Sequence, residues 1–222
     1  MAKKLVIVGA GKTAELFGTY FKDADRQVVG FAVESRFINK TDMLGLPIVA
    51  FESVEDKFPA REHEMFIAIA SSRLNRDRAR LFEMAKSKGY NFASYVSPHA
   101  YLDKHAKIGE NVFIFENNVV QYGCSIGDDT ILWSGNHIGH ETEIGKHVFI
   151  SSHIVISGYC KIGDYCFLGV NSTIADSVEL GRDCTVGAGA LIAGNLAANC
   201  IVQPAKMDIR EGLSRKFWKV RE

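Results

Sequence analysis

The chain has 222 residues, of which 47% are hydrophobic, so it can form one large or two small domains with an ordinary core. Its 26 basic and 26 acidic residues cancel without long runs of one charge, which argues against binding to nucleic acid or to a membrane surface. We therefore expect a small-molecule ligand. The apolar run from Leu5 to Val8 is too short for a signal-peptide core or a membrane span, which favours a cytoplasmic location.

Strand and helix patterns alternate in the first half of the chain. The sequence predicts strands at 5–8, 27–33, 65–70 and 92–95, and helices at 12–21 and 74–88. Such alternation is typical of a parallel sheet whose strands are connected by helices. We therefore expect an α/β, Rossmann-like domain over residues 1–95.

The turn between the first strand and the first helix has the spacing GxGxxA, formed by Gly9, Gly11 and Ala14. Free N–H groups at the start of a helix can bind a phosphate there. A P-loop is excluded, because its first glycine would have to be Val6. Glu34 ends the second strand, where a dinucleotide-binding domain places the acid that binds ribose. Taken alone, these residues suit NAD nearly as well as a nucleotide sugar, but about 90 residues hold only one mononucleotide-binding half.

A strict six-residue repeat fills the second half of the chain. An aliphatic residue recurs seventeen times, at Val96, Leu102, Ile108, Ile114, Val120, Ile126, Leu132, Ile138, Ile144, Ile150, Ile156, Ile162, Leu168, Ile174, Leu180, Val186 and Ile192. Eight of these residues are followed by glycine, which permits a turn. The hexapeptide repeat is known to form a left-handed parallel β-helix with three hexads per coil. We therefore assign residues 96–193 to such a β-helix and residues 194–222 to a C-terminal tail.

The position four residues after each aliphatic residue is mostly small or β-branched, and it also points inward. Four of the five cysteines occupy this position, namely Cys124, Cys160, Cys166 and Cys184. We expect them to be buried packing residues. An odd number of cysteines without a CxxC pair also argues against a disulfide framework and against a structural zinc site.

A short Rossmann-like domain that runs into an uninterrupted hexapeptide β-helix resembles the bacterial nucleotide-sugar acetyltransferases. This family includes the sialic acid O-acetyltransferase and the bacillosamine-pathway N-acetyltransferase, and the resemblance covers nearly the whole chain. It rests on the GxGxxA turn, the Ala68-Ile69-Ala70 strand followed by Asn75 and Arg78, the hexads, His140-Glu141, the segment from Phe167 to Asn171, and Pro204-Ala205-Lys206. The chain departs from the family pattern at Lys12-Thr13, Ser71-Ser72, Phe149 and Ile201-Val202-Gln203.

The resemblance implies a homotrimer with its active site between subunits, acetyl-CoA as co-substrate, and no metal. The catalytic pair would be His140 and Glu141. Acetyl-CoA would be bound by Gly158, Val170, Ala188 and Lys206. The sugar nucleotide would be bound by Gly9, Gly11, Lys12, Glu34, Asn75 and Arg78.

His140 suits the chemistry of acetyl transfer. A thioester gives its acetyl group to an amine or a hydroxyl when a base removes the proton of the attacking group, and a histidine is poised for this near neutral pH. A neighbouring carboxylate, Glu141, can orient the imidazole ring. In the six-residue register, His140 projects outward between Tyr122 of the preceding coil and Gly158 of the next. We expect Gly158 to leave room beside the ring for a pantetheine arm.

Other outward residues of the repeat are expected to lie on the surface or between subunits. These are His137, His147, His153 and Trp133. Zinc catalysis of the kind found in β-helix carbonic anhydrases is disfavoured, because it uses an HxxxxH pair and no two histidines here are five residues apart.

We therefore expect an acetyl-CoA-dependent N-acetyltransferase that acts on a nucleotide-linked amino-deoxysugar. Two alternatives remain open at this point: O-acetylation of a sugar, such as sialic acid, on the same scaffold, and a non-catalytic module that binds nucleotide sugars.

Overall fold

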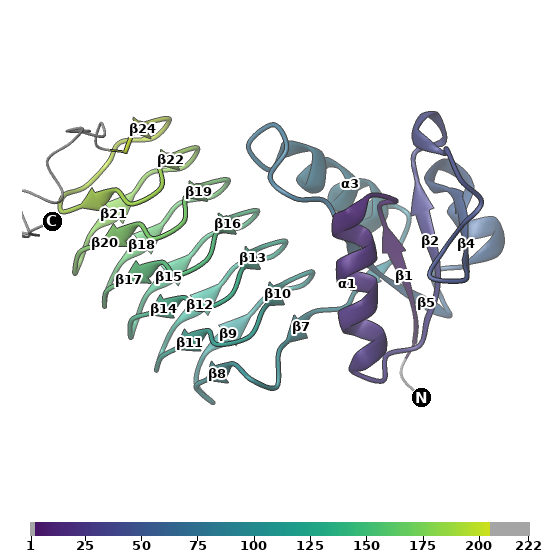
Figure 1. The fold of residues 1–222 in the computed structure, drawn as a ribbon, viewed down its shortest axis with the longest axis horizontal. Helices are drawn as coiled ribbons and strands as arrows, with labels where there is room; N and C mark the ends of the chain where they lie inside the picture. The colour runs from purple at the N-terminus through teal and green to yellow at the C-terminus, as the bar shows by residue number, and fades with distance from the viewer. Residues whose placement is uncertain (1–2, 205–222) are drawn as a thin grey trace, which may run out of the picture.

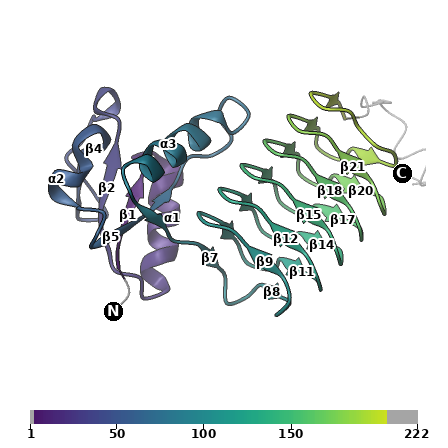
Figure 2. The same cartoon turned by 180° about the vertical axis from the view of Figure 1, so that it is seen from behind.

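We describe residues 3–204 of a computed structural model of the protein. An N-terminal domain with a mostly parallel sheet lies beside a long β-helix (Figure 1). Helices α1 (Lys12–Asp23) and α3 (Arg76–Ser87) lie on the side of the domain toward the β-helix. Helix α2 (Val54–Lys57) and strand β4 (Leu46–Ala50) lie at the far side (Figure 2). Within residues 3–204, no helix is long and apolar enough to cross a membrane.

The N-terminal sheet has six strands in the order β3-β4-β2-β1-β5-β6, and only the β3–β4 pair is antiparallel. The remaining strands are β1 (Lys4–Val8), β2 (Val28–Val33), β3 (Asp42–Met43), β5 (His63–Ile67) and β6 (Asn91–Phe92), and short 3₁₀ turns occupy Ser35–Phe37 and Phe51–Ser53. Helix α1 covers one face of the sheet, where Phe17 and Phe21 pack on Phe31 and Phe66. Helices α2 and α3 cover the other face. The expected alternation of strands and helices is therefore present.

Two predicted boundaries were wrong at the approach to α3. Strand β5 ends at Ile67, not at residue 70, and α3 begins at Arg76, not at residue 74. Arg73, Leu74 and Asn75 have φ angles of +50°, +51° and +64°, a left-handed conformation that cannot continue into a right-handed helix. The predicted strand at 92–95 is also divided, because β6 ends at Phe92 and the first β-helix strand begins at Tyr95.

Two-residue parallel strands between Tyr95 and Val202 form the β-helix. They are β7 (Tyr95–Val96), β8 (Tyr101–Leu102), β9 (Lys107–Ile108), β10 (Phe113–Ile114), β11 (Val119–Val120), β12 (Ser125–Ile126), β13 (Ile131–Leu132), β14 (His137–Ile138), β15 (Glu143–Ile144), β16 (Phe149–Ile150), β17 (Val155–Ile156), β18 (Lys161–Ile162), β19 (Phe167–Leu168), β20 (Thr173–Ile174), β21 (Glu179–Leu180), β22 (Thr185–Val186), β23 (Leu191–Ile192) and β24 (Ile201–Val202). The expected parallel β-helix is present, and its hexapeptide repeats fit the left-handed form. Strand β24 pairs with β22 inside the segment that we expected to be a tail.

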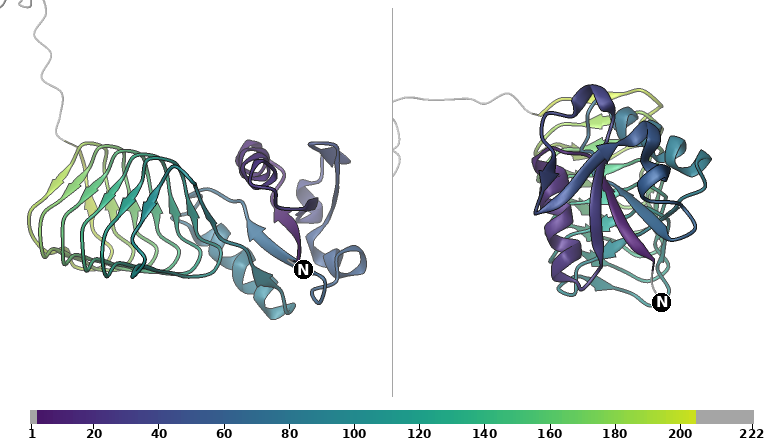
Figure 3. Two further views of the ribbon diagram at one scale, coloured as in Figure 1. Left: turned by 90° about the horizontal axis from the view of Figure 1, so that it is seen from below. Right: turned by 90° about the vertical axis from the view of Figure 1, so that its right-hand side faces the viewer.

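The strands stack into three sheets, which Figure 3 shows from two further directions. Sheet I contains β7, β10, β13, β16, β19, β22 and β24; sheet II contains β8, β11, β14, β17, β20 and β23; and sheet III contains β9, β12, β15, β18 and β21. The second residue of each strand points inward, as the register predicts, and most of these residues are buried in one long core. The four cysteines of the small inward position are also buried.

The outward faces of the three sheets differ in chemistry. On sheet I they include a row of aromatic side chains, and α1 covers Phe113 and Phe115. On sheet III four of the five strands begin with a charged residue, namely Lys107, Glu143, Lys161 and Glu179, and Lys161 pairs with Glu179. On sheet II, from β11 onward, they carry no Lys, Arg, Asp or Glu; the residues are Val119, Gln121, His137, Gly139, Val155, Ser157, Thr173, Ala175, Leu191 and Ala193. Sheet II is therefore the uncharged face of the β-helix.

Candidate active site

His140 lies in the turn between β14 and β15, at the corner where sheet II passes into sheet III. Its side chain is exposed, and its backbone N–H donates to Oε1 of Gln121 (3.0 Å). A Cβ atom built on Gly158 would lie 2.6 Å from Cε1 and 2.8 Å from Nε2 of His140, so the imidazole itself fills the space beside this glycine. The edge of Tyr159 also contacts the ring, with 4.8 Å between ring centroids. The expected room for a pantetheine arm at this position is therefore taken by the ring.

The side chain of Glu141 points away from His140. Its backbone has φ +54° and its N–H donates to the carbonyl of Tyr122 (2.8 Å). A Cβ on Gly123 would lie 2.7 Å from Oε1 of Glu141, which places the carboxylate over the preceding coil. His140 leans toward the following coil. Among the described residues, no hydrogen bond or ion pair joins these two side chains, so the expected orienting contact is not formed within one chain.

The four other outward residues of the repeat lie in four different settings. His137 is half-buried on the sheet II face, and His153 is exposed beside Gly135. His147 is buried, with its Nδ1 2.7 Å from Oδ2 of Asp129. Trp133 faces outward as expected, but it stacks on Phe115 beneath the N-terminal domain (centroids 4.7 Å apart), where we had expected a contact between subunits. Within residues 3–204, no three His, Cys, Asp or Glu side chains gather in a way that could hold a metal ion.

The residues expected to bind acetyl-CoA lie at two corners. Gly158 stacks on His140 at the corner between sheets II and III. Val170 and Ala188 are both exposed and lie one coil apart at the corner between sheets I and II. The two groups thus flank the uncharged face of sheet II. Lys206 lies outside the described residues.

A cleft of about 430 Å³ opens at the carboxyl ends of β1, β2 and β5. Gly9, Gly11 and Glu34 line it, and its other residues are Val8, Ala10, Val33, Arg36, Phe37, Asn39, Ile69, Ser72, Asp77, Arg80 and Leu81. Gly9 has φ +131°, and a Cβ there would lie 3.1 Å from the carbonyl oxygen of Ala68, so a larger residue does not fit. Gly11 precedes α1 without a side-chain cap, which leaves the first N–H groups of the helix available.

Two arginines that sequence reasoning missed lie at this cleft. Oε1 of Glu34 is 3.2 Å from Arg36, and Oε2 of Glu34 is 2.8 Å from Arg80. Arg36 is only two residues after Glu34, so its proximity could have been read from the sequence. Arg80 comes from α3, and no local pattern reveals that it reaches β2. Lys12 does not line the cleft; it is exposed and paired with Glu15 (2.8 Å).

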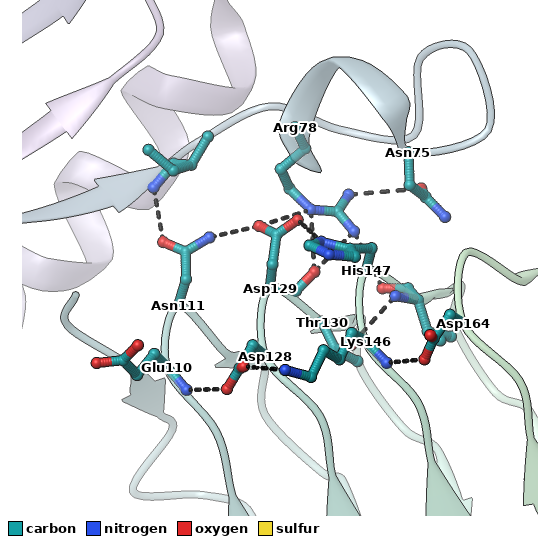
Figure 4. Close-up of polar contacts among 12 residues, drawn as sticks. Asn75, Arg78, Glu110, Asn111, Asp128, Asp129, Thr130, Lys146, His147 and Asp164 are labelled. Carbon is teal, nitrogen blue, oxygen red and sulfur yellow. Dashed lines mark hydrogen bonds and ion pairs between the residues drawn. The ribbon is translucent and has the colours of Figure 1, made fainter. Parts of the chain in front are cut away.

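Asn75 and Arg78 do not reach the cleft either. Both side chains are fully buried between the N-terminal domain and the β-helix (Figure 4). The Arg78 guanidinium lies 3.2 Å from Oδ1 of Asp129 and donates to three carbonyl oxygens, those of Ala70, Asp129 and Val148. Burial lowers the pKa of Arg78, and the Asp129 carboxylate opposes this. In this structure neither side chain lines the cleft, and their donors are bonded to backbone carbonyls of the interface and of Ala70.

Sequence comparisons match the repeat region. A profile described as "Bacterial transferase hexapeptide (six repeats)" matches residues 105–140, and one described as "Hexapeptide repeat of succinyl-transferase" matches residues 159–193. The comparison with curated proteins found no match to this sequence.

Solved structures match nearly the whole chain. A mutant of perosamine N-acetyltransferase from Caulobacter crescentus, in complex with CoA and GDP-perosamine, is 22% identical with a TM-score of 0.82, covering 95% of this chain and 99% of that one. The acetyltransferase domain of PglB from Neisseria gonorrhoeae, in complex with acetyl coenzyme A, is 20% identical with a TM-score of 0.82, covering 92% and 97%. WeeI from Acinetobacter baumannii is 17% identical with a TM-score of 0.57, covering 89% and 98%.

At these identities the structural similarities establish the fold, and the repeat profiles establish the kind of repeat. Together they confirm the resemblance found in the sequence. The chain carries transferase hexapeptide repeats over residues 105–140 and 159–193, and it has the fold of the perosamine N-acetyltransferase and of the PglB acetyltransferase domain.

Proposed function

We propose that the chain is an acyltransferase that moves an acetyl group from acetyl-CoA to the amino group of a nucleotide-linked amino sugar. One observation carries the proposal: the same chain has an exposed histidine on a hexapeptide β-helix and a nucleotide-type cleft at the carboxyl ends of parallel strands. The structures most similar in fold include an N-acetyltransferase with CoA and GDP-perosamine bound and a domain with acetyl coenzyme A bound.

His140 acts as the general base in this proposal. The amine attacks the thioester carbonyl carbon, His140 takes the proton of the attacking nitrogen, and the tetrahedral intermediate collapses to the amide and the CoA thiolate. The CoA thiolate then takes the proton from the imidazolium of His140, which restores the base. Because the amine attacks the thioester directly, no covalent enzyme intermediate is needed. Glu141 supports the imidazolium through its nearby negative charge, without a direct contact in the free chain.

The N-terminal domain, residues 1–95, binds the nucleotide in a Rossmann-like manner. The N–H groups that follow Gly9 and Gly11 face the phosphates, and Lys12 adds positive charge at the start of α1. Glu34 meets the ribose or the base after it exchanges one of its arginine partners.

The active site is completed by a second copy of the chain. His140 lies at the corner between sheets II and III, whereas the cleft lies in the N-terminal domain, which packs on sheet I. We propose a homotrimer in which the uncharged face of sheet II is buried. That arrangement brings the His140 corner of one protomer toward the corner of its partner that carries Val170 and Ala188, so that acetyl-CoA binds between them.

The deciding experiment is an acetyl-transfer assay on matched nucleotide sugars that carry either an amine or a hydroxyl at the same carbon. Formation of free CoA thiol and of the amide with the amino sugar alone is expected. Turnover of the hydroxy sugar alone would replace this proposal with O-acetylation. Failure to bind acetyl-CoA, measured by calorimetry, would leave only a non-catalytic binding module.

A further inference from the structure

Residues 68–75, which we call the cleft wall, connect β5 to α3. Ile69 and Ser72 of this segment line the cleft. The segment ends in three consecutive left-handed residues, Arg73, Leu74 and Asn75. Residues other than glycine avoid this conformation, and Asn tolerates it better than Arg or Leu. A conformation of this kind persists only when the surrounding structure holds it.

The wall is held at its start, its middle and its end. Directly before the start, the N–H of Ile67, the last residue of β5, donates to Oδ1 of Asn111 in the β-helix (2.7 Å). In the middle, Nη1 of Arg78 donates to the carbonyl of Ala70 (2.9 Å). At the end, Nδ2 of Asn75 donates to the carbonyl of Cys166 (3.1 Å). Two of the three contacts therefore reach the β-helix directly.

The third contact reaches the β-helix through Arg78. Its Nη2 donates to the carbonyls of Asp129 (2.9 Å) and Val148 (3.2 Å). The Asp129 carboxylate is fixed in turn by Nδ2 of Asn111 (2.6 Å) and by the ring of His147 (Figure 4). These partners belong to one row of turn residues, each a coil apart, which we call the docking row: Asn111, Asp129, His147, Tyr165 and Asp183.

We infer that Asn75 and Arg78 are positioning residues, which hold the wall of the sugar-nucleotide cleft through the β-helix without touching the ligand. The inference rests on the proposed function of the cleft. Neither side chain is exposed, and no residue of the docking row lines the cleft. The affinity of the N-terminal domain for its nucleotide thus depends on contacts made by the other half of the chain.

Two substitutions at one position separate the anchor from the backbone conformation. Asn75→Gly keeps the freedom to adopt positive φ but removes the hydrogen bond to Cys166, whereas Asn75→Ala removes both. Arg76→Gln is the matched control, because Arg76 pairs with Asp183 and stacks on Tyr165 in the same docking row but does not line the cleft. Each full-length variant is titrated with UDP, with GDP and with acetyl-CoA in a calorimeter.

Without the anchor, the wall would adopt its binding conformation only part of the time. If that fraction is about a tenth, the variant binds UDP or GDP, whichever the wild type binds, with a Kd about tenfold higher. We expect a rise of this size in the nucleotide Kd for Asn75→Gly and a larger rise for Asn75→Ala. The affinity for acetyl-CoA should be unchanged in both variants. The control Arg76→Gln should keep the wild-type affinity for the nucleotide. In turnover assays the KM for the sugar nucleotide rises while kcat is kept. A purely structural defect would instead lower kcat through loss of folded protein and leave KM unchanged.

Arg78→Lys is a second variant, which retains a positive charge beside Asp129 and loses the fork of hydrogen bonds. It gives the same readout if Asn75→Gly does not fold. Wild-type nucleotide affinity in Asn75→Gly, or an equal loss in Arg76→Gln, overturns the inference. A wild-type protein that binds neither UDP nor GDP contradicts the proposed nucleotide site instead, so the two failures are distinct.

Discussion

The imidazole of His140 lies against the backbone of Gly158, one coil further along the β-helix. Atoms Cε1, Nε2 and Nδ1 of the ring would all lie within 3.0 Å of a Cβ atom at Gly158. The glycine therefore fixes where the ring can rest, and the edge of Tyr159 limits its rotation. The position of the proposed base depends on the absence of a side chain in the next coil.

Gly158→Ala tests this dependence. The added methyl group displaces a flexible side chain and no backbone atom, so we expect the melting temperature to change little. Misplacement of a reacting group by about 1 Å can reduce the rate by about 100-fold, and we expect a fall in kcat of up to that size. Gly194→Ala is the control, because a Cβ there meets no atom within 4 Å. Equal kcat values in the two variants would show that the resting place of the ring is unimportant.

His140→Ala should reduce kcat by about 10² to 10⁴, the usual contribution of a general base. The exposed side chain adds little to the core, so assembly, melting temperature and acetyl-CoA affinity should be unchanged. His105→Ala is a matched control, since His105 is also exposed and lies in a turn between sheets II and III, away from the corner that carries Val170 and Ala188. Steady-state kinetics with a saturating amino-sugar acceptor measure the difference. Retention of most activity in His140→Ala would mean that another group or water takes the proton.

Glu141→Gln should have a smaller effect. Where a carboxylate bonds directly to the catalytic histidine, its loss lowers kcat by a factor of about 10⁴. Because the side chains of Glu141 and His140 are separated, we expect kcat to fall by less than about tenfold. The pH dependence of kcat is the second measurement. A loss as large as that of His140→Ala would indicate that Glu141 rotates onto the ring when the substrates bind.

The β-helix was predicted accurately because its core repeats every six residues. Each predicted inward aliphatic residue is the second residue of a strand, and the cysteines at the small inward position are buried. A one-residue shift of the register would turn every inward residue outward, so only one register of the strands is consistent with the pattern. The exposure of His140 followed from the same register.

The docking of the two domains could not be predicted in this way. Asn75 and Arg78 follow a strand end, where ligand-binding residues often lie, yet their partners Asp129 and Cys166 are 51 or more residues away. The left-handed conformation of Leu74 likewise has no local signal. One clue was present: Asn111, Asp129 and His147 recur at intervals of three hexads, which marks a polar row along one corner.

Thiol reactivity tests the placement of the cysteines. Burial raises the pKa of the Cys124, Cys160 and Cys166 thiols, that of Cys166 to about 12, so these thiols stay protonated and unreactive at pH 8. In the native protein, only the partly exposed Cys200 should react quickly with a disulfide reagent. In denaturant, all five cysteines should react quickly. Rapid labelling of Cys166 in the folded protein would contradict its position in the core.

The same shifts predict a loss of stability in alkaline solution. Because folding raises the pKa of these thiols above the unfolded value, their contribution to stability is complete below about pH 8.5 and declines as the pH rises toward the folded values. The melting temperature should therefore fall between pH 8 and pH 10. Replacement of Cys166 by Ala, which cannot ionise, should reduce the size of that fall.

The uncharged face of sheet II leads to the last prediction. Val155 and Leu191 project from it with 42% and 68% of their surface exposed in the single chain. Val155→Asp would bury a charge in the proposed trimer contact, which is costly without a partner, so the protein should sediment as a monomer at micromolar concentration. Lys107→Glu on the charged face of sheet III is the control and should leave the assembly intact. The monomeric variant keeps its cleft and His140, and we still expect it to lose acetyl transfer, because acetyl-CoA would bind between protomers. A variant that is monomeric and fully active would show that one chain contains the whole active site.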